Sequence, residues 1–353
     1  MFGLDYFIYY ILSFFNEDKE INTSQIFHVL QGKRTPSMFY TAEKNNWHHG
    51  FANFPRISRE KLEQMVQQFL QANWVETKNK GFILTDLGRN KIDGYFATRY
   101  FPVHLTSFSN IKLRRPFWDR YQLLTQIFSE KSYKNNKYIP IIKHPVHQEN
   151  IRAFFHYFKH QDDQLLERWI KEQYSLFSYI EEIRVNRLFM HLSGHAVIGK
   201  TKAQVREKCS MERLEYEFYH LDTIENMLQC IKKHREELPL TFAIVKSLQQ
   251  ETSYGLSSST YDTYLAIQKG KSITDVSVER RLKENTIREH LLEIAFVFDA
   301  FPYETFISPK VREALNEKFD QDSDYSFKKA VSDFPSIEFM DYRLVELERM
   351  RRV

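Results

Sequence analysis

Eight residues in the middle of the chain have the spacing of a phosphate-binding loop. Residues 194–201 read Gly-His-Ala-Val-Ile-Gly-Lys-Thr and match the GxxxxGK[ST] pattern. In that pattern backbone amides surround the phosphates and the lysine reaches their oxygens. The chemistry would be nucleotide binding, and its residues would be Gly194, Gly199, Lys200 and Thr201.

The residues before this motif do not suit that chemistry. A phosphate-binding loop leaves a β-strand and enters a helix of a parallel sheet, whereas residues 181–192 hold apolar side chains at helical spacing among Glu and Arg. Thr201 and Gln204 have the spacing of a capping box. We therefore interpret the motif as a turn into a helix over 203–209 and expect no bound cofactor.

A second group of polar residues lies in two predicted helices near the C-terminal end. Ser272 and Asp275 form a capping-box pattern at the head of a helix over 273–281, and a longer amphipathic helix over 286–298 follows a short turn. This arrangement is typical of a helix-turn-helix, whose second helix enters the major groove of DNA. Val278, Leu282, Ile287 and Leu291 are expected to pack the two helices together. The predicted DNA-contacting residues of this unit are Arg280, Arg281, Lys283, Asn285, Thr286, Arg288 and His290.

A third group consists of cations near the N-terminus, where a winged-helix order of elements is predicted. Helices over 4–15, 25–31 and 59–72 precede two short β-type runs around residues 77–81, and a helix over 87–96 follows. Residues 33–55 are expected to be irregular. The cations predicted to hold DNA phosphates are Lys33, Arg34, Arg59, Lys78 and Lys80.

Composition limits the class of protein. The 353 residues include 30 Phe and 20 Tyr but only 10 Gly and 10 Pro, which excludes global disorder and favours long helices. A net charge of +4 permits nucleic-acid binding without requiring it. The two cysteines lack the spacing of a metal site. His156 and His160 have a spacing that allows two metal ligands on one helix face, but no acid at matched spacing and no second pair accompanies them, so we expect no metal. The apolar start, residues 1–15, is too short to span a bilayer, so a cytoplasmic protein is predicted.

The fold class predicted from these patterns is mainly α, with three parts in chain order. Residues 1–101 are expected to form a winged-helix domain with a small β-hairpin as its wing. Residues 102–256 are expected to form a helical middle region, with exposed basic connections at 114–116 and 131–137 and a possible further helix-turn-helix near 186–232. Residues 257–353 are expected to form a helix-turn-helix domain.

The C-terminal part resembles a helicase-associated helix-turn-helix domain. The residues that carry the resemblance are Thr260–Tyr264, Gly270–Ile273, Val278–Leu282, Thr286–Ile294 and Asp341–Val345. Ile26–Thr35 and Ile57–Arg59 are similar to the winged-helix region of RecQ-type helicases. A chain with both features and no helicase motor resembles the YpbB family of Gram-positive bacteria, which is encoded beside a RecQ-type helicase. Val278 departs from the pattern, because a small Ala is common at its position.

The resemblance implies a non-enzymatic accessory of a RecQ-type helicase in DNA repair or recombination, associated with the nucleoid. Its expected partners are the helicase and duplex or forked DNA, with a single-strand-binding protein as a further candidate and no membrane. Two alternatives stay open. One is a sequence-specific transcription regulator, which would need a dimer and a palindromic site. The other is a structural adaptor whose helix-turn-helix units pack on protein.

Overall fold

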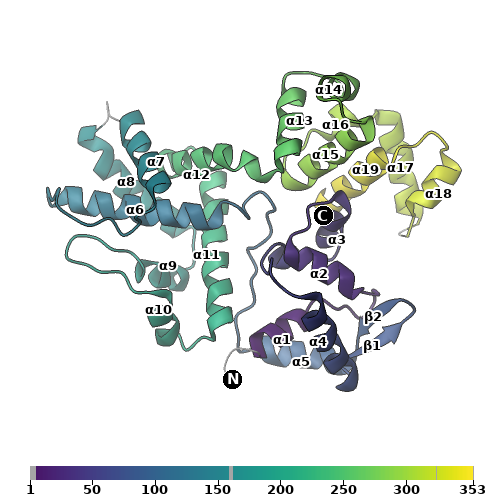
Figure 1. The fold of residues 1–353 in the computed structure, drawn as a ribbon, viewed down its shortest axis with the longest axis horizontal. Helices are drawn as coiled ribbons and strands as arrows, with labels where there is room; N and C mark the ends of the chain where they lie inside the picture. Colours follow the sequence, from purple (N-terminus) through teal and green to yellow (C-terminus); the bar gives the residue numbers. More distant parts are fainter. Residues whose placement is uncertain (1–4, 159–161, 323, 353) are drawn as a thin grey trace. The chain divides into compact units, whose positions relative to one another are not determined.

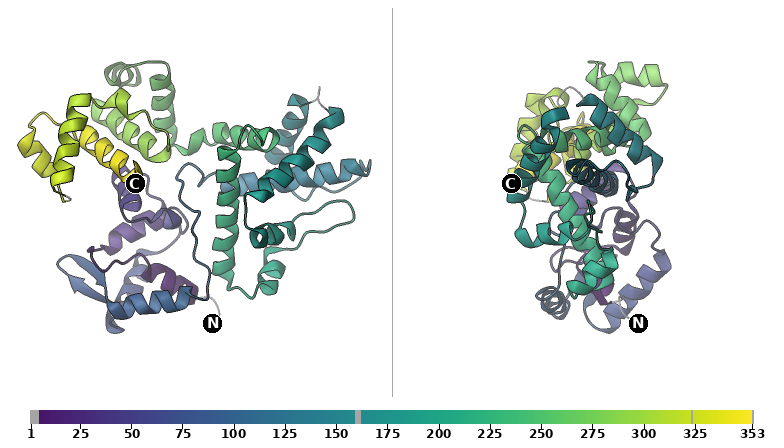
Figure 2. Two further views of the ribbon diagram at one scale, coloured as in Figure 1. Left: turned by 180° about the vertical axis from the view of Figure 1, so that it is seen from behind. Right: turned by 90° about the vertical axis from the view of Figure 1, so that its left-hand side faces the viewer.

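The described part of the chain is mainly helical and includes one small β-hairpin (Figures 1 and 2). A computed structural model describes residues 5–158, 162–322 and 324–352. The predicted mainly α fold is confirmed, and the hairpin lies where the sequence predicted it, on either side of residues 79–80.

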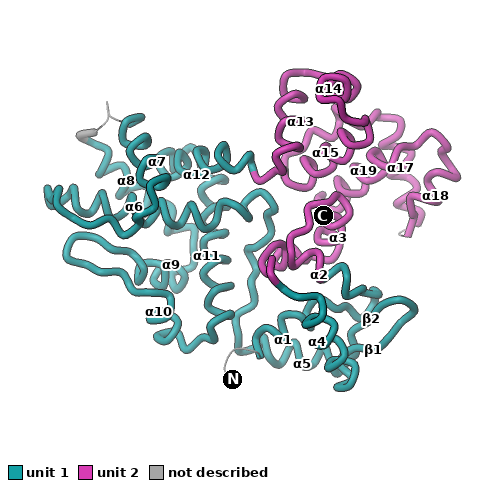
Figure 3. The backbone as a smooth tube through the Cα atoms, viewed as in Figure 1, with its two compact units in different colours: residues 1–26, 57–254 teal, residues 27–56, 255–353 magenta. Residues whose placement is uncertain are grey.

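The described residues form two compact units, and neither unit is continuous in sequence (Figure 3). Unit 1 comprises residues 1–26 and 57–254, and unit 2 comprises residues 27–56 and 255–353. The segment 27–56 therefore groups with the C-terminal part of the chain rather than with its sequence neighbours. One helix, α2 (Thr23–Gln31), begins in the first unit and ends in the second.

Unit 1 contains the hairpin and most of the long helices. Its further elements are, in chain order, α1 (Asp5–Leu12), α4 (Arg59–Gln71), β1 (Val75–Lys78), β2 (Gly81–Leu84), α5 (Asp86–Phe96), α6 (Arg114–Ser132), α7 (Pro145–Tyr157), α8 (Asp162–Ser178), α9 (Glu182–Phe189), α10 (Lys202–Lys208), α11 (Arg213–Lys233) and α12 (Pro239–Glu251).

Aromatic side chains connect the N-terminal elements of unit 1 to its long helix α11. The ring of Tyr9 on α1 stacks on Tyr95 of α5 with 4.2 Å between centroids, and Tyr10 lies 4.5 Å from Phe218 of α11. Burying large aromatic rings stabilises such contacts through their area and through ring–ring geometry. Most apolar side chains of residues 5–15, the described part of the apolar N-terminal segment, are buried in this core.

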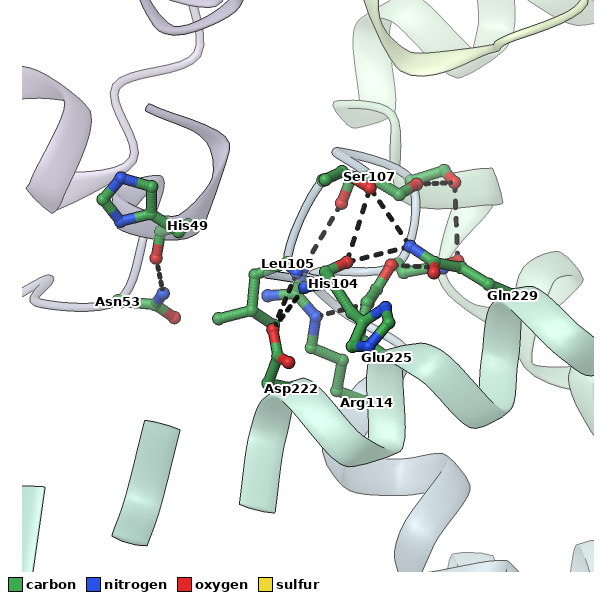
Figure 4. Close-up of polar contacts among 12 residues, drawn as sticks. His49, Asn53, His104, Leu105, Ser107, Arg114, Asp222, Glu225 and Gln229 are labelled. Atoms are coloured by element: carbon green, nitrogen blue, oxygen red, sulfur yellow. Dashed lines mark hydrogen bonds and ion pairs between the residues drawn. The ribbon is translucent and has the colours of Figure 1, made fainter. Parts of the chain in front are cut away.

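Buried carboxylates on α11 hold the connection between α5 and α6 (Figure 4). Asp222 is fully buried and accepts the backbone N–H groups of His104 and Leu105 at 2.7 and 3.0 Å. Glu225, also fully buried, accepts the Arg114 Nε–H group at 2.6 Å. A buried carboxylate is tolerated only when such donors replace its water, so these bonds fix the connection along α11.

This network corrects one expectation about residues 114–116. Arg114 begins α6 and is buried, so it is not part of an exposed connection. Pro116 lies in the first turn of α6, where the N–H groups have no acceptor within the helix, so proline is tolerated there. The other expected connection, 131–137, is largely exposed as predicted.

Unit 2 is built around the helix-turn-helix segment and the helices that follow it. Its elements are, in chain order, α3 (Pro36–Lys44), the 3₁₀ turn η1 (His48–Gly50), α13 (Ser258–Gln268), α14 (Ile273–Arg280), α15 (Glu284–Val297), α16 (Tyr303–Phe306), α17 (Pro309–Gln321), α18 (Phe327–Asp333) and α19 (Phe339–Arg352). The ring of Phe39 on α3 stacks on Phe296 of α15 with 6.0 Å between centroids.

The helix α3 was not expected, because residues 33–55 were predicted to be irregular. Thr35 caps it by accepting the N–H group of Met38, and Pro36 occupies its first turn. Both residues are favourable at these positions. The start signal was therefore present in the sequence, but the helix is short and its burial depends on α15, which is distant in sequence.

Glu43 joins α3 to the C-terminal helix α19. Its carboxylate accepts the Nε–H group of Arg351 at 3.0 Å and lies 3.0 Å from His48 Nε2. Burial alone would raise the pKa of Glu43, but the hydrogen bonds from His48 and Arg351 outweigh it and lower the pKa to about 2. A carboxyl group with a depressed pKa stabilises the fold above its ordinary pKa of 4.5 and loses that contribution as the pH falls.

We therefore predict that the contribution of Glu43 to the free energy of unfolding is lost in acid. Glu43→Gln should lower the free energy of unfolding by about 2 kcal/mol at pH 7, and the difference from the wild type should shrink between pH about 4.5 and about 2. Urea unfolding at pH 7 and at about pH 3 measures it. Glu304→Gln, at an exposed position of the same unit, is the control. An equal difference at both pH values would contradict the prediction.

Candidate nucleic-acid interface

The helix-turn-helix of unit 2 consists of α14, a three-residue turn and α15 (Figure 1). The capping box of Ser272 and Asp275 at the head of α14 is present, as predicted. α14 ends at Arg281, whose φ of 53° is left-handed, and the Leu282 N–H group donates to Ser277 O at 3.1 Å. This closing geometry is the usual one for a helix C-terminus, although glycine is the common residue there.

The packing of the two helices differs from the prediction at one residue. Val276, Ile287 and Leu291 are fully buried, whereas Val278 is 75% exposed. Two residues correspond to about 200° around a helix, so Val276 and Val278 lie on opposite faces of α14. The expectation that Val278 packs the helices together is therefore wrong, and Val276 has that role.

Only the start of α15 is available to a partner. All seven residues from Leu291 to Val297 are buried, so the second half of this helix lies in the core of unit 2. Lys283, Asn285 and Glu289 are exposed near its start, together with Arg281 in the turn. A recognition helix contacts base edges through its N-terminal residues, and this is the part of α15 that remains exposed.

Arg280 and His290 belong to a polar cluster between the helices. The Arg280 guanidinium donates to Ser259 O at 2.7 Å and to Thr263 Oγ1, which connects α14 to α13. His290 Nδ1 lies 2.8 Å from Thr263 Oγ1. Burial lowers the pKa of His290 and the charge of Arg280 lowers it further, so the imidazole is neutral at pH 7. The structure thus places both residues within the fold rather than on its open face.

Arg288 and Arg34 are also paired within unit 2. The Arg288 guanidinium lies 3.0 Å from Glu284 and pairs with Glu338 just before α19. Arg34 Nη2 lies 2.8 Å from Glu293 Oε1, with Glu293 only 7% exposed. Lys33 is exposed and Thr286 is half-buried. Of the predicted contact residues in this unit, Lys33, Arg281, Lys283 and Asn285 are the exposed ones.

The helix-turn-helix has no excess of positive charge. Residues 258–297 contain six basic and six acidic side chains. Phosphate neutralisation supplies most non-specific DNA affinity, so a balanced segment of this kind cannot bind DNA strongly through charge alone. Affinity would have to come from hydrogen bonds that the exposed polar residues make to bases and phosphates.

The predicted phosphate contacts of unit 1 lie on α4 and on the hairpin. Arg59 is exposed at the start of α4 and pairs with Glu63 at 2.9 Å. Lys78 and Lys80 are exposed on either side of the tip of the hairpin. The backbone N–H group of Lys80 donates to Glu20 at 2.8 Å, so an acidic side chain lies beside the tip.

Sequence reasoning missed a row of amides on α4. Gln64, Gln67, Gln68 and Gln71 are all exposed, while Leu62 and its apolar neighbours are buried. Glutamine can form two hydrogen bonds with adenine in the major groove, so these side chains are candidate base contacts. The sequence contained the signal for them, because the apolar face of this helix had already been assigned and the opposite face is rich in glutamine.

The phosphate-loop match is a turn between helices, as the sequence predicted. Helix α9 precedes it rather than a strand, and Thr201 forms the predicted capping box with Gln204 at the head of α10. A Cβ atom on Gly199 would lie 2.1 Å from His191 O, and one on Gly194 would lie 2.4 Å from Ser129 Oγ. Close packing therefore explains both glycines without a bound phosphate.

Two further findings concern metals and membranes. Among the residues that the structure describes, no group of three or more His, Cys, Asp or Glu side chains is arranged to hold a metal ion. His160, one of the histidine pair considered above, lies outside the described residues. None of the described helices combines the length and the apolar character that crossing a bilayer requires.

Comparisons with known proteins agree with the sequence analysis. A family described as a helix-turn-helix domain matches residues 259–346. Protein YpbB of Bacillus subtilis (strain 168) is 21% identical to the chain over 300 residues, which are 82% of this chain and 81% of that protein. No solved structure matches the chain significantly. The resemblance predicted from the sequence and the C-terminal helix-turn-helix domain are thereby confirmed.

The placement of the arginines predicts which of them hold the fold. Arg280→Ala and Arg288→Ala should each lower the free energy of unfolding by about 1–3 kcal/mol, because they leave hydrogen-bonding partners unsatisfied. Arg281→Gly removes the same charge but should change stability by less than about 1 kcal/mol, since glycine accepts the left-handed backbone readily. Urea unfolding of the three variants measures this. A larger loss for Arg281→Gly than for Arg280→Ala would contradict it.

Proposed function

We propose that this protein is a non-enzymatic DNA-binding accessory of a RecQ-type helicase that acts in DNA repair or recombination. The observation that carries the proposal is the helix-turn-helix over α14 and α15, whose exposed residues are donors at the start of the second helix. Arg281 and Lys283 would contact phosphates, and Asn285 would contact a base edge. Arg280, Arg288 and Arg34 would support this surface from within unit 2.

The N-terminal elements support a second DNA-binding element of the winged-helix type. Helix α4 leads into the β1–β2 hairpin, and Ile21 pairs with Phe82 of β2 as a one-residue extension of that sheet. This bridge between α1 and α2, paired with the hairpin, suits the winged-helix order predicted from the sequence. In this proposal α4 offers its exposed glutamines to a groove, and Lys78 and Lys80 contact phosphates from the wing.

The charge balance determines what kind of binding the proposal implies. Residues 258–297 contain six acidic and six basic residues. The affinity of this segment for DNA should therefore be moderate, and the affinity should depend only weakly on salt concentration. A protein that binds weakly by itself suits a role beside an enzyme that already holds DNA, because a tethered second contact acts at high effective concentration. Duplex or forked DNA is the proposed ligand.

The proposed protein partners follow from the resemblance to the YpbB family. The first is the RecQ-type helicase, and a single-strand-binding protein at the same fork is a further one. Such partners would place the protein in the cytoplasm with the nucleoid. The remaining exposed surface of both units is available for these contacts, and the proposal assigns no particular residue to them.

One observation favours a second candidate, in which the helix-turn-helix docks on protein. Val278 is 75% exposed on α14, next to the exposed Glu279. An apolar side chain with an acidic neighbour is poorly suited to the phosphate backbone and better suited to a protein surface. A structural adaptor would therefore use α14, whereas a DNA-binding protein would use the turn and the start of α15.

The two candidates are separated by binding measurements on matched variants. Arg281→Gly with Lys283→Gln and Asn285→Ala should weaken binding to labelled duplex or forked DNA by about 10-fold or more, because base and phosphate contacts are lost together. Fluorescence anisotropy at about 50 and 200 mM salt measures affinity and salt dependence. Lys310→Gln with Lys328→Gln, at exposed positions of unit 2, is the control for total charge.

The outcomes for the helicase partnership are read separately. The purified RecQ-type helicase should bind the wild-type protein in the absence of DNA, and the triple variant should retain this association. Loss of helicase binding in Val278→Asp with unchanged DNA binding would favour protein docking through α14. An unchanged DNA affinity in the triple variant would exclude the proposed DNA contact.

A further inference from the structure

A basic surface of unit 1 lies where two distant segments meet. The first is the connection after α6: between Glu130 and Glu149 the sequence holds four lysines and no acidic residue. The second is the connection between α9 and α10, which matches the phosphate-loop pattern: residues 190–201 hold Lys200 and no acidic residue. Figures 1 and 2 show the α9–α10 connection projecting beside the C-terminal end of α6.

Two rings join these segments and form an exposed stack. The imidazole of His195 lies parallel to the ring of Tyr133, with centroids 4.3 Å apart and an interplanar angle of 20°. Tyr133 is 66% exposed, so much of its ring surface is accessible. An exposed aromatic ring on which further rings can stack is the recurring feature of sites for single-stranded nucleic acid.

The stack is held firmly by the end of α6. The backbone N–H group of His195 donates to Ser129 Oγ at 3.0 Å, and its Nδ1 lies 2.9 Å from Glu130 Oε2. Asn135 donates to the same carboxylate oxygen at 2.6 Å. The hydrogen bonds from His195 and Asn135 lower the pKa of Glu130. Glu130, only 7% exposed, is therefore ionised at neutral pH and uses its carboxylate to orient His195 beneath the stack.

Lysines of the same two segments have the exposure that phosphate contacts require. Lys134, Lys137 and Lys143 are exposed and Lys200 is partly exposed. None of these four forms an ion pair with a residue that the structure describes, in contrast to the arginines of the helix-turn-helix. Exposed cations on the two segments that carry the ring stack can supply the electrostatic attraction, and the stack can supply the base contacts, on which single-strand binding depends.

Apolar side chains extend the platform at the tip of the turn. Ile198 is 92% exposed and Val197 is 59% exposed, in a tight turn closed by the bridge between Gly194 and Val197. No hydrophobic core explains these side chains. Unpaired bases present apolar faces that a duplex conceals, so an exposed Ile and Val on the same turn as His195 fit unstacked bases better than they fit paired DNA.

We propose that Tyr133, His195 and the lysines at positions 134, 137 and 200 form a binding surface for single-stranded nucleic acid. Bases stack on Tyr133, which His195 supports from behind, and the lysines hold the phosphates. The site shares no residue with the helix-turn-helix or with the N-terminal hairpin. Its failure would leave the proposed duplex contacts of unit 2 untouched, and the reverse is also true.

The test is the binding of the full-length protein to a labelled oligo(dT) of about 15 nucleotides, measured by fluorescence anisotropy at low salt. Tyr133→Ala should weaken binding about 5- to 100-fold, the range measured for the loss of one stacked base. Tyr133→Phe should bind like the wild type, because it keeps the ring. Tyr174→Ala, at a tyrosine that is 77% exposed on α8, is the matched control and should have no effect.

The charge contribution is measured independently. Lys134→Gln with Lys137→Gln should weaken oligo(dT) binding and reduce the salt slope by about 1.4, since each phosphate contact on a single strand contributes about 0.7. Lys310→Gln with Lys328→Gln changes the total charge equally and should leave the slope unchanged. Because all these positions are exposed, circular dichroism should show unchanged folding.

Three results would overturn the proposal. The first is the absence of oligo(dT) binding by the wild type at about 50 mM salt. The second is equal binding by Tyr133→Ala and the wild type. The third is an equal effect of Tyr133→Ala on oligo(dT) and on duplex DNA, because a stacking site requires unpaired bases.

Discussion

The helix-turn-helix of this protein depends on one carboxylate, that of Glu293. It is 7% exposed and accepts the Arg34 guanidinium at 2.8 Å, the Ser257 N–H group at 3.0 Å and the Thr260 hydroxyl at 2.6 Å. Burial alone would raise the pKa of Glu293, but the charge of Arg34 and these hydrogen bonds outweigh it and lower the pKa. One side chain thus joins the segment after α2, the head of α13 and the helix α15.

That constraint explains why so many basic residues are unavailable for binding. A buried carboxylate needs several donors, and α15 carries it on the face that turns toward α13. Arg34 is held by Glu293, Arg280 by α13, and Arg288 by the residues before α19. Of the cations in the helix-turn-helix that were predicted to contact DNA, Arg281 and Lys283 remain exposed, and both lie in the turn between α14 and α15. Selection of contact residues by type alone could not make this distinction.

The sequence predicted the local structure well and the long-range packing poorly. Periodicity and capping signals located α4, the hairpin, α14 and α15 to within a few residues, because those signals act over one or two turns. Val278 was assigned to the wrong face, since an eight-residue helix has too few apolar positions to fix its orientation. The grouping of residues 27–56 with the C-terminal unit was invisible, because it rests on contacts such as Arg34–Glu293 between residues 259 apart.

The motif that looked most like an enzyme shows how the same residues serve a different purpose. Only glycine fits at positions 194 and 199, because Ser129 and His191 lie against Gly194 and Gly199, and Thr201 caps a helix. Once the glycines are explained by packing, Lys200 is left as a cation in a surface turn rather than as a catalytic group.

The chain therefore shows two kinds of basic surface. In unit 2 the acids of the same helices bind most of the arginines, whereas Lys134, Lys137, Lys143 and Lys200 of unit 1 form no ion pair with a residue that the structure describes. An exposed and unpaired cation can neutralise a phosphate and displace the counterions condensed on the nucleic acid. A paired cation must first break its ion pair. The stronger electrostatic attraction for a polyanion therefore belongs to unit 1. The helix-turn-helix is left to contribute geometry, and any selectivity between nucleic-acid structures must come from combining the two.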